Sequence, residues 1–310
     1  MIKVLCLNPT IDRVYHIQNF KAGTQYHGNI ANEYIGGKGI NVAHVLKQLG
    51  DNPLLYCFLG GRNGSFIEEG LEHIGVPTRI FNLEGETRIT INIIDRTNGK
   101  ETEITEVGSI AKETEIDLFL SELNSNLNSD DIVIASGLPA NGMKSDIYKT
   151  ISTMCESKKA KCIMDANGKY LESSFPSKYF FIKPNEAELG LLFNEGKKLS
   201  TEKIVELSSK LIEMGVENVL ITRGANGAIF INKEKKYNIS VPDEPILSTI
   251  GCGDSTVAGF CFGYTHNMSI EECLRLSMAT GISNAKIGKI GVIDNFDIEE
   301  LIPKISLKPL

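Results

Sequence analysis

The 310-residue sequence lacks an excess of positive charge, a long apolar run and paired cysteines. Its formal net charge is -7, which argues against a nucleic-acid partner because such a surface needs a basic field. Anionic small molecules stay possible, since they need only local positive charge. No uncharged apolar run approaches the ~20 residues of a membrane span, so we expect no membrane partner.

The cysteines favour a reducing compartment. The sequence has seven, but they form no C-x-x-C pair and no cluster with histidine. An odd number in a chain of this length indicates buried, reduced thiols rather than a disulfide framework or a zinc site. The first residues, MIKVLCLNPTID, have no signal-peptide layout. We therefore expect a cytoplasmic protein.

Short apolar runs recur along the chain, and each ends in polar residues or glycine. Such runs are typical of strands covered on both faces; they occupy 2–7, 132–135, 162–164, 179–182 and 219–221. Helical spacing of apolar residues predicts helices at 41–49, 66–73, 116–127, 147–158, 202–214 and 269–285. This alternation predicts one α/β domain over 1–310, with a mostly parallel sheet and helices on both faces. Ligands bind such sheets outside the carboxyl ends of the strands.

One region departs from this pattern. The segment TRITINIID, 87–95, alternates strictly between apolar and polar side chains, and Asn98-Gly99 follows it. That dipeptide is a strong signal for a hairpin turn. A half-polar hairpin does not fit a sheet covered on both faces, so we expect a small β lid formed by about 13–35 and 87–107.

The first glycine cluster is IGGKGINVA, 35–43. It is not a P-loop, because Asn32 and Gly39 stand where that motif needs glycine and serine or threonine, and no G-x-G-x-x-G occurs elsewhere. The cluster is either a plain turn before a helix or a backbone that approaches a ligand, with Lys38 as a charge. The local sequence leaves both interpretations open.

Two further motifs each have a local and a functional interpretation. TRGANGA, 222–228, reads as a hairpin turning at Asn226-Gly227, whose amides could also face a phosphate. In KPNEAE, 183–188, Asn185 is an ordinary helix N-cap. Glu188, one turn later, could instead hold a hydrated Mg²⁺, which binds few carboxylates and keeps its waters.

The last motif is STIGCGDSTVAGF, 248–260, which places two glycines before an acid and an apolar helix. Locally, Asp254 could be the N-cap of that helix. A cap needs no flanking glycines, however. Gly251 and Gly253 suggest instead a backbone that curls around an anion, which helix N-termini bind through their free amides.

Together, IGGKGINVA, KPNEAE and STIGCGDSTVAGF resemble the signatures of the PfkB, or ribokinase-like, sugar kinases, over essentially the whole chain. LNPTID at 7–12 and GETR at 85–88 are similar to the branch of 1-phosphofructokinases and tagatose-6-phosphate kinases. There are three departures from the family pattern: Ser248 replaces an aspartate, Cys252 replaces an alanine, and the branch usually has serine near Asn167.

The resemblance implies a ribokinase-like α/β fold with a small β-sheet lid, ATP and Mg²⁺ as cosubstrates, and a homodimer formed through the lid. It implies that Asp254 is the catalytic base and that the amides of Gly251, Cys252 and Gly253 form an anion hole. It also implies three binding groups: Asp12, Gly37, Lys38, Asn41, Arg88 and Ser136 for the sugar phosphate; Lys183, Asn185, Thr222, Gly224, Gly227 and Asn284 for the nucleotide; and Glu188 for the metal.

The expected activity is ATP-dependent phosphorylation of a ketohexose phosphate, with fructose 1-phosphate as the first candidate acceptor. Tagatose 6-phosphate is the nearest alternative, and a nucleoside, an unphosphorylated sugar or an inactive sugar-phosphate sensor are more distant ones. We expect Asp254 to be well ionised and a weak base, because a helix N-terminus stabilises negative charge.

Overall fold

The computed structural model describes residues 1–27, 32–166 and 168–310. Two sequence predictions concern positions outside the described residues: part of the predicted lid segment 13–35, and the departure at Asn167. None of the described helices is both long and apolar enough to cross a membrane.

The described residues form a ten-stranded sheet in the order β14-β13-β12-β11-β10-β9-β8-β1-β4-β5. Seven neighbouring strands pair in parallel: β11, β10, β9, β8, β1, β4 and β5. At the β11 edge, β12, β13 and β14 add antiparallel pairs. The predicted, mostly parallel sheet is therefore confirmed. The strands are β1 (Ile2–Cys6), β4 (Leu54–Leu59), β5 (Thr78–Asn82), β8 (Ile132–Ser136), β9 (Lys161–Asp165), β10 (Tyr179–Ile182), β11 (Val216–Thr222), β12 (Ala228–Asn232), β13 (Lys236–Ser240) and β14 (Ser306–Pro309).

Helices cover both faces of this sheet. Successive residues of a strand point to opposite faces, so the parallel strands contribute to two buried clusters. In β1, Val4 belongs to one buried cluster and Leu5 to the other. The first cluster is completed by α1 (Lys38–Leu49), α2 (Gly61–His73), α8 (Cys252–Thr265), α9 (Ile270–Ile287) and α10 (Asn295–Leu301). The second is completed by α3 (Glu113–Ser125), α4 (Ile147–Lys158), α5 (Gly168–Glu172), α6 (Glu186–Leu192) and α7 (Thr201–Glu213).

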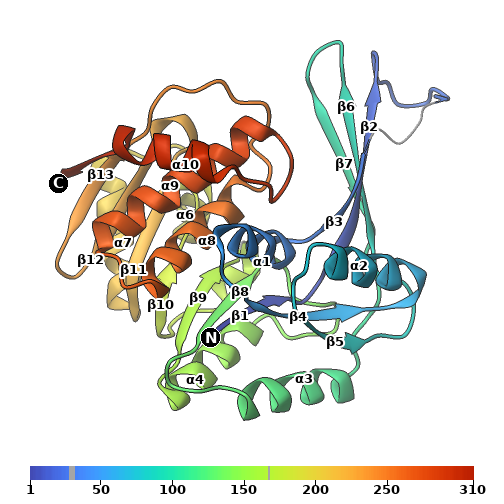
Figure 1. Cartoon of the computed structure of the whole chain (residues 1–310), viewed down its shortest axis with the longest axis horizontal. Coiled ribbons are helices and arrows are strands. Elements are labelled where there is room, and N and C mark those ends of the chain that lie inside the picture. Colours follow the sequence, from blue (N-terminus) through green and yellow to red (C-terminus); the bar gives the residue numbers. More distant parts are fainter. Residues whose placement is uncertain (28–31, 167) are drawn as a thin grey trace.

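A second sheet projects from this body as a lid (Figure 1). Its order is β3-β2-β6-β7, from β2 (Thr10–Ile17), β3 (Asn32–Gly36), β6 (Ile89–Asp95) and β7 (Glu101–Thr105). The β6 and β7 strands are antiparallel neighbours on either side of Asn98-Gly99, as the alternating pattern predicts. Only a short turn separates β1 from β2, so the chain passes directly from the main sheet into the lid.

Candidate active site

A cavity of about 800 Å³ lies at the carboxyl ends of the parallel strands and extends under the lid. It brings together residues from opposite ends of the sequence, since its lining includes the starts of α1 and α8. All of the predicted site residues except Asn284 line it: Asp12, Gly37, Lys38, Asn41, Arg88, Ser136, Lys183, Asn185, Glu188, Thr222, Gly224, Gly227, Gly251, Cys252, Gly253 and Asp254.

Asn284 lies behind this lining, inside α9. It is 1% exposed, and its side-chain amide donates to the carbonyl oxygens of Lys289 and Val292, at 2.7 and 3.0 Å. A Cβ placed on Gly251 would lie 3.2 Å from its Oδ1. In this structure Asn284 therefore braces the chain after α9 and packs behind the glycine turn.

Gly251 and Gly253 lie at a helix start with a left-handed cap. Gly251 is the N-cap of α8, at φ 80° and ψ -6°, a conformation that side chains disfavour. Asp254 therefore sits in the first turn of α8 rather than at its cap, and the N-cap interpretation of Asp254 is wrong. The first amides of a helix have no partner within it, so this turn offers donors to an anion in the cavity.

Gly253 has a separate reason to lack a side chain. A Cβ there would lie 3.0 Å from the Nζ of Lys183, which comes from the end of β10. Glycine at this position lets a cation approach the helix start closely. The helix N-terminus and Lys183 thus act on the same small volume of the cavity.

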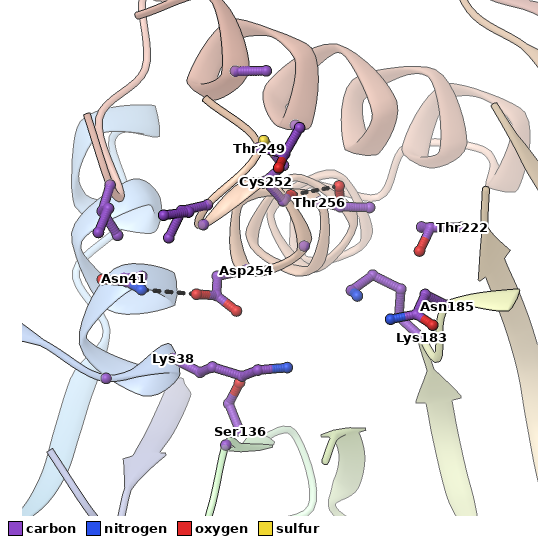
Figure 2. A pocket seen from close by; sticks show the side chains of 18 of the residues that line it. Lys38, Asn41, Ser136, Lys183, Asn185, Thr222, Thr249, Cys252, Asp254 and Thr256 are labelled. Atoms are coloured by element: carbon purple, nitrogen blue, oxygen red, sulfur yellow. Dashed lines mark hydrogen bonds between the residues drawn. The ribbon is translucent and has the colours of Figure 1, made fainter. Parts of the chain in front are cut away.

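The carboxylate of Asp254 is almost enclosed. Its side chain is 5% exposed, and the amide of Asn41 donates to its Oδ2 at 2.8 Å (Figure 2). Burial raises the pKa of Asp254 to about 6, although the nearby charge of Lys38 opposes the shift. The expectation of a weak base is therefore corrected, because loss of hydration disfavours the charged form, whereas the expectation of an ionised carboxylate near neutral pH stands. A carboxyl with this pKa is a better proton acceptor near neutral pH.

Two lysines act on this carboxylate, and they share one buried partner that sequence reasoning missed. Asp165, the last residue of β9, accepts Lys38 on Oδ2 at 3.2 Å and Lys183 on Oδ1 at 3.4 Å. In Figure 2 the lysines enter the space below α8 from opposite sides. The signal in the sequence was the position of Asp165 at the end of a predicted strand, where polar residues gather.

One end of the cavity, where the sugar phosphate is expected to bind and which is called the sugar end below, lies beneath the lid. Arg88 precedes β6 and donates to the carbonyl oxygens of Asn8 and Pro9, at 3.0 and 3.3 Å. Burial raises the pKa of Asp12 to about 7, against the opposing charge of Arg88. Ser136, at the end of β8, is 1% exposed, and its hydroxyl has no hydrogen-bond partner among the described residues. This end therefore offers a cation, a carboxyl and an unsatisfied hydroxyl to a polar ligand.

The other end is built on the β11–β12 hairpin. The predicted hairpin is present, but its turn is longer than Asn226-Gly227, because a 3₁₀ turn over Gly224–Asn226 precedes Gly227. Thr222 forms an isolated bridge with Asn185, which joins this turn to the start of α6. The apolar side chains of Ile246, Ile250, Met278, Ile282 and Ile290 complete the lining. A flat aromatic group and a phosphate chain would both find suitable surfaces here.

Asn185 and Glu188 form a capping box on α6. Asn185 Oδ1 accepts from the amide of Glu188 at 2.9 Å, and the Glu188 carboxylate accepts from the amide of Asn185 at 2.8 Å. The local interpretation of Asn185 as a cap is thus correct. Glu188 also lines the cavity, so its carboxylate can serve the helix and a ligand together.

The fold and this site define a class of enzyme. A helix N-terminus, two lysines and a buried carboxyl converge at the strand ends, beneath a lid. Positioning and electrostatic stabilisation of this kind are what phosphoryl transfer requires.

The comparisons agree with that class. The model of the pfkB carbohydrate kinase family matches residues 1–298. The 1-phosphofructokinase of Bacillus subtilis is 31% identical over 310 residues, covering 100% of both chains. The tagatose-6-phosphate kinase of Staphylococcus epidermidis is 31% identical over 99% of both. The chain therefore belongs to the pfkB family of carbohydrate kinases and is a phosphotransferase.

Solved structures confirm the ribokinase-like fold. A protein from Staphylococcus aureus, 32% identical, aligns with a TM-score of 0.84 over 100% of this chain and 99% of its own. Phosphofructokinase-2 from Escherichia coli, 22% identical, aligns with a TM-score of 0.89 over 97% and 98%. At that identity the second match shows the fold alone.

Proposed function

We propose that this kinase transfers the γ-phosphoryl group of ATP to fructose 1-phosphate, giving fructose 1,6-bisphosphate. The observation that carries the proposal is the sugar end of the cavity, where Lys38 and Arg88 accompany the carboxyl of Asp12. An acceptor sugar that already carries a phosphate needs cations to bind that phosphate, and its hydroxyl groups can form hydrogen bonds with the carboxyl of Asp12. The Bacillus subtilis relative supports fructose 1-phosphate, and the Staphylococcus epidermidis relative supports tagatose 6-phosphate as a second candidate.

Asp254 is the proposed base for the acceptor hydroxyl. Its raised pKa suits this role, and the hydrogen bond from Asn41 fixes its orientation. Amides of Gly251, Cys252 and Gly253 would steady charge on the transferring group, together with Lys183. Phosphoryl transfer passes through a loose transition state, so the proton is needed late and the fixed charges contribute most.

ATP would lie along the other end of the cavity. Its phosphates would meet Asn185, Thr222 and the turn at Gly224 and Gly227, two glycines with positive φ angles, since turns of this kind can form anion-binding concavities. Asn284 would act indirectly, by bracing the glycine turn. Bound ATP supplies the phosphoryl group for transfer.

Mg²⁺ would be held at Glu188. Within residues 1–27, 32–166 and 168–310, no group of three or more His, Cys, Asp or Glu is arranged to hold a metal ion. Mg²⁺ does not require such a cluster, because it binds through one or two carboxylates, substrate phosphates and water. A single carboxylate at the nucleotide end fits that mode.

Glu188→Gln tests the metal assignment. The substitution keeps a carbonyl oxygen for the Asn185 amide, so α6 should still begin correctly. We expect the Mg²⁺ concentration for half-maximal rate to rise by about tenfold, since a charged ligand is lost. Glu186→Gln is the control, because Glu186 shares the same first turn but contacts Leu199 and Arg223 instead. A Mg²⁺ titration of Glu188→Gln matching the wild type would contradict the assignment.

The acceptor is tested by ADP release with fructose 1-phosphate, fructose 6-phosphate, tagatose 6-phosphate and ribose. We expect the highest kcat/KM with fructose 1-phosphate. A higher value with tagatose 6-phosphate would favour the second candidate, and one with ribose would refute a phosphorylated acceptor. ATP and sugar-phosphate binding without turnover of any sugar would instead indicate a sensor on the same fold.

We also propose that two copies pair through the lid. All five residues of its edge strand β7 are exposed, including Ile104 at 54%. An exposed edge strand with an apolar side chain is a ready surface for association. Light scattering should give twice the chain mass for the wild type and a lower mass for Ile104→Asp. A wild-type monomer at micromolar concentration would contradict the pairing.

A further inference from the structure

Asp165 has no role in the chemistry described above. It ends β9, is 2% exposed, and is not among the residues that line the cavity. A carboxylate without its own hydration is costly unless it is paired and hydrogen-bonded. Its partners are Lys38 and Lys183, one on each oxygen, at 3.2 and 3.4 Å. Asp165 therefore acts from beneath the cavity floor, through these lysines.

The two lysines belong to opposite ends of the reaction. Lys38 opens α1 and lies beside Ser136 at the sugar end (Figure 2). Lys183 follows β10, is 4% exposed, and its Nζ faces the backbone at Gly253. Asp254 lies at the start of α8, above Lys38 and to the left of Lys183 in Figure 2, and the charges of both lysines act on it. One buried carboxylate thus holds both of the lysine cations that act on Asp254.

We propose that Asp165 is a positioning residue that sets the spacing and orientation of Lys38 and Lys183 around the transferring phosphoryl group. The proposal rests on the kinase function proposed above. It adds a residue that touches neither ligand but determines where the two cations stand.

The physical reason lies in the lysine side chain. Its ammonium is a point charge on a flexible four-carbon stem, so a lysine alone does not provide a fixed site. Two ammonium groups in one poorly hydrated cavity also repel each other. A carboxylate between them removes the repulsion and fixes both stems before the substrates arrive. Charges fixed in advance stabilise a transition state more than charges that must reorganise.

Asp165→Asn is the first test. Asparagine is nearly the same size, but it is uncharged and can accept from only one lysine, since its NH₂ is a donor. We expect kcat to fall by about 10²-fold, the size associated with losing a preorganised electrostatic group. The KM for each substrate should stay within about threefold of the wild type or decrease, because the cavity becomes more positive and its ligands are anions.

The pH profile gives a readout that a purely structural role would not move. The charged groups acting on Asp254 are Lys38 from α1, Lys183 after β10 and Asp165 from β9. The charge of Asp165 raises the pKa of Asp254, so its removal should lower that pKa. The acidic limb of kcat/KM should then move to lower pH by at least about half a unit. The ionisation of the sugar phosphate is common to all variants, so the difference reports on the enzyme.

Asp131→Asn is the matched control. Asp131 is also a buried carboxylate paired with a buried lysine, since it is 3% exposed and bridges to Lys3. It lies just before β8, at the opposite end of the strands from the cavity. We expect Asp131→Asn to lower the Tm while leaving kcat and the acidic limb unchanged.

Asp165→Glu separates position from charge. It keeps the negative charge but displaces it by one methylene. We expect kcat to fall, while the acidic limb of kcat/KM stays at its wild-type pH. A wild-type kcat in both Asp165 variants would overturn the proposal, as would a rise in either KM with kcat unchanged. If neither variant folded, Asp165 would be a scaffold residue and the proposal would also be wrong.

Binding separates this proposal from the choice of acceptor. If the wild type phosphorylated none of the sugar phosphates, the proposed function would fail. Calorimetry with ATP would still test Asp165, because an uncompensated Lys183 should bind ATP as tightly as the wild type or more tightly in Asp165→Asn. ATP binding weakened more than about threefold, with Asp131→Asn unaffected, would contradict the positioning role.

Discussion

Asp254→Asn should abolish turnover, with kcat lower by about 10³-fold or more, within the range for losing a general base and its charge. The oxygen of asparagine can still accept from the amide of Asn41, so the start of α8 should keep its shape. ATP should bind nearly as in the wild type, because Asp254 lies between the two ends of the cavity rather than at the nucleotide end.

The measurement is single-turnover ADP formation together with ATP calorimetry. Asp51→Asn is the control, since burial also raises the pKa of Asp51 but it bonds Thr265 and lies outside the cavity lining. It should keep wild-type turnover. Residual activity above about 10% in Asp254→Asn would refute the base assignment, because loss of a base costs far more.

Stability provides an internal check on the same variant. The pKa of Asp254 is raised in the folded state to about 6 from a usual 3.8. The folded chain therefore holds this proton more tightly, and its stability decreases as pH rises from about 4 through about 6. Asparagine has no charge to bury, so above about pH 6 the Asp254→Asn variant lacks this loss of stability. Its Tm at pH 8 should therefore equal or exceed that of the wild type.

Arg88→Ala should raise the KM for the sugar phosphate by about 10²-fold while changing the KM for ATP by less than about threefold, since a charge-assisted contact to phosphate is lost at one end only. Arg88 lies at the base of the lid, where bonds to Asn8 and Pro9 aim it into the cavity. Steady-state kinetics with each substrate varied in turn gives both values.

Arg79→Ala is the control for that variant. Arg79 is an exposed arginine on β5 that pairs with Glu122 and lies outside the cavity lining. It should leave both KM values unchanged. Equal increases for sugar phosphate and ATP in Arg88→Ala would indicate a general loss of structure and would contradict a phosphate-binding role.

The sequence predicted the layers of this fold well, because apolar periodicity reports directly on burial. The 147–158 helix and the 179–182 strand were predicted with their observed ends. Helix starts were less accurate. The helix predicted from Asn41 begins at Lys38, and the one predicted from Phe66 begins at Gly61. The glycines in these segments predicted a loop. In the structure Gly37 and Gly60 are the N-cap residues, and the helices begin directly after them.

The site residues were predictable where a local motif carried them, as in 183–188 and 251–254. Properties that depend on three-dimensional burial were not. The helix start alone favours an ionised Asp254, but the surrounding protein removes its water. Asp165 was missed because its function lies in two lysines that only the folded sheet brings together. Asn284 was predicted at the nucleotide, but its hydrogen bonds turn it toward the chain after α9.

The most direct test of the account is the ratio of kcat/KM for fructose 1-phosphate to that for unphosphorylated fructose, measured in the wild type and in Arg88→Ala. A cavity built for an acceptor that already carries a phosphate should give a wild-type ratio above about 10², worth roughly 3 kcal/mol, and the ratio should fall to near one in Arg88→Ala. A wild-type enzyme that phosphorylates fructose as efficiently as fructose 1-phosphate would contradict the account.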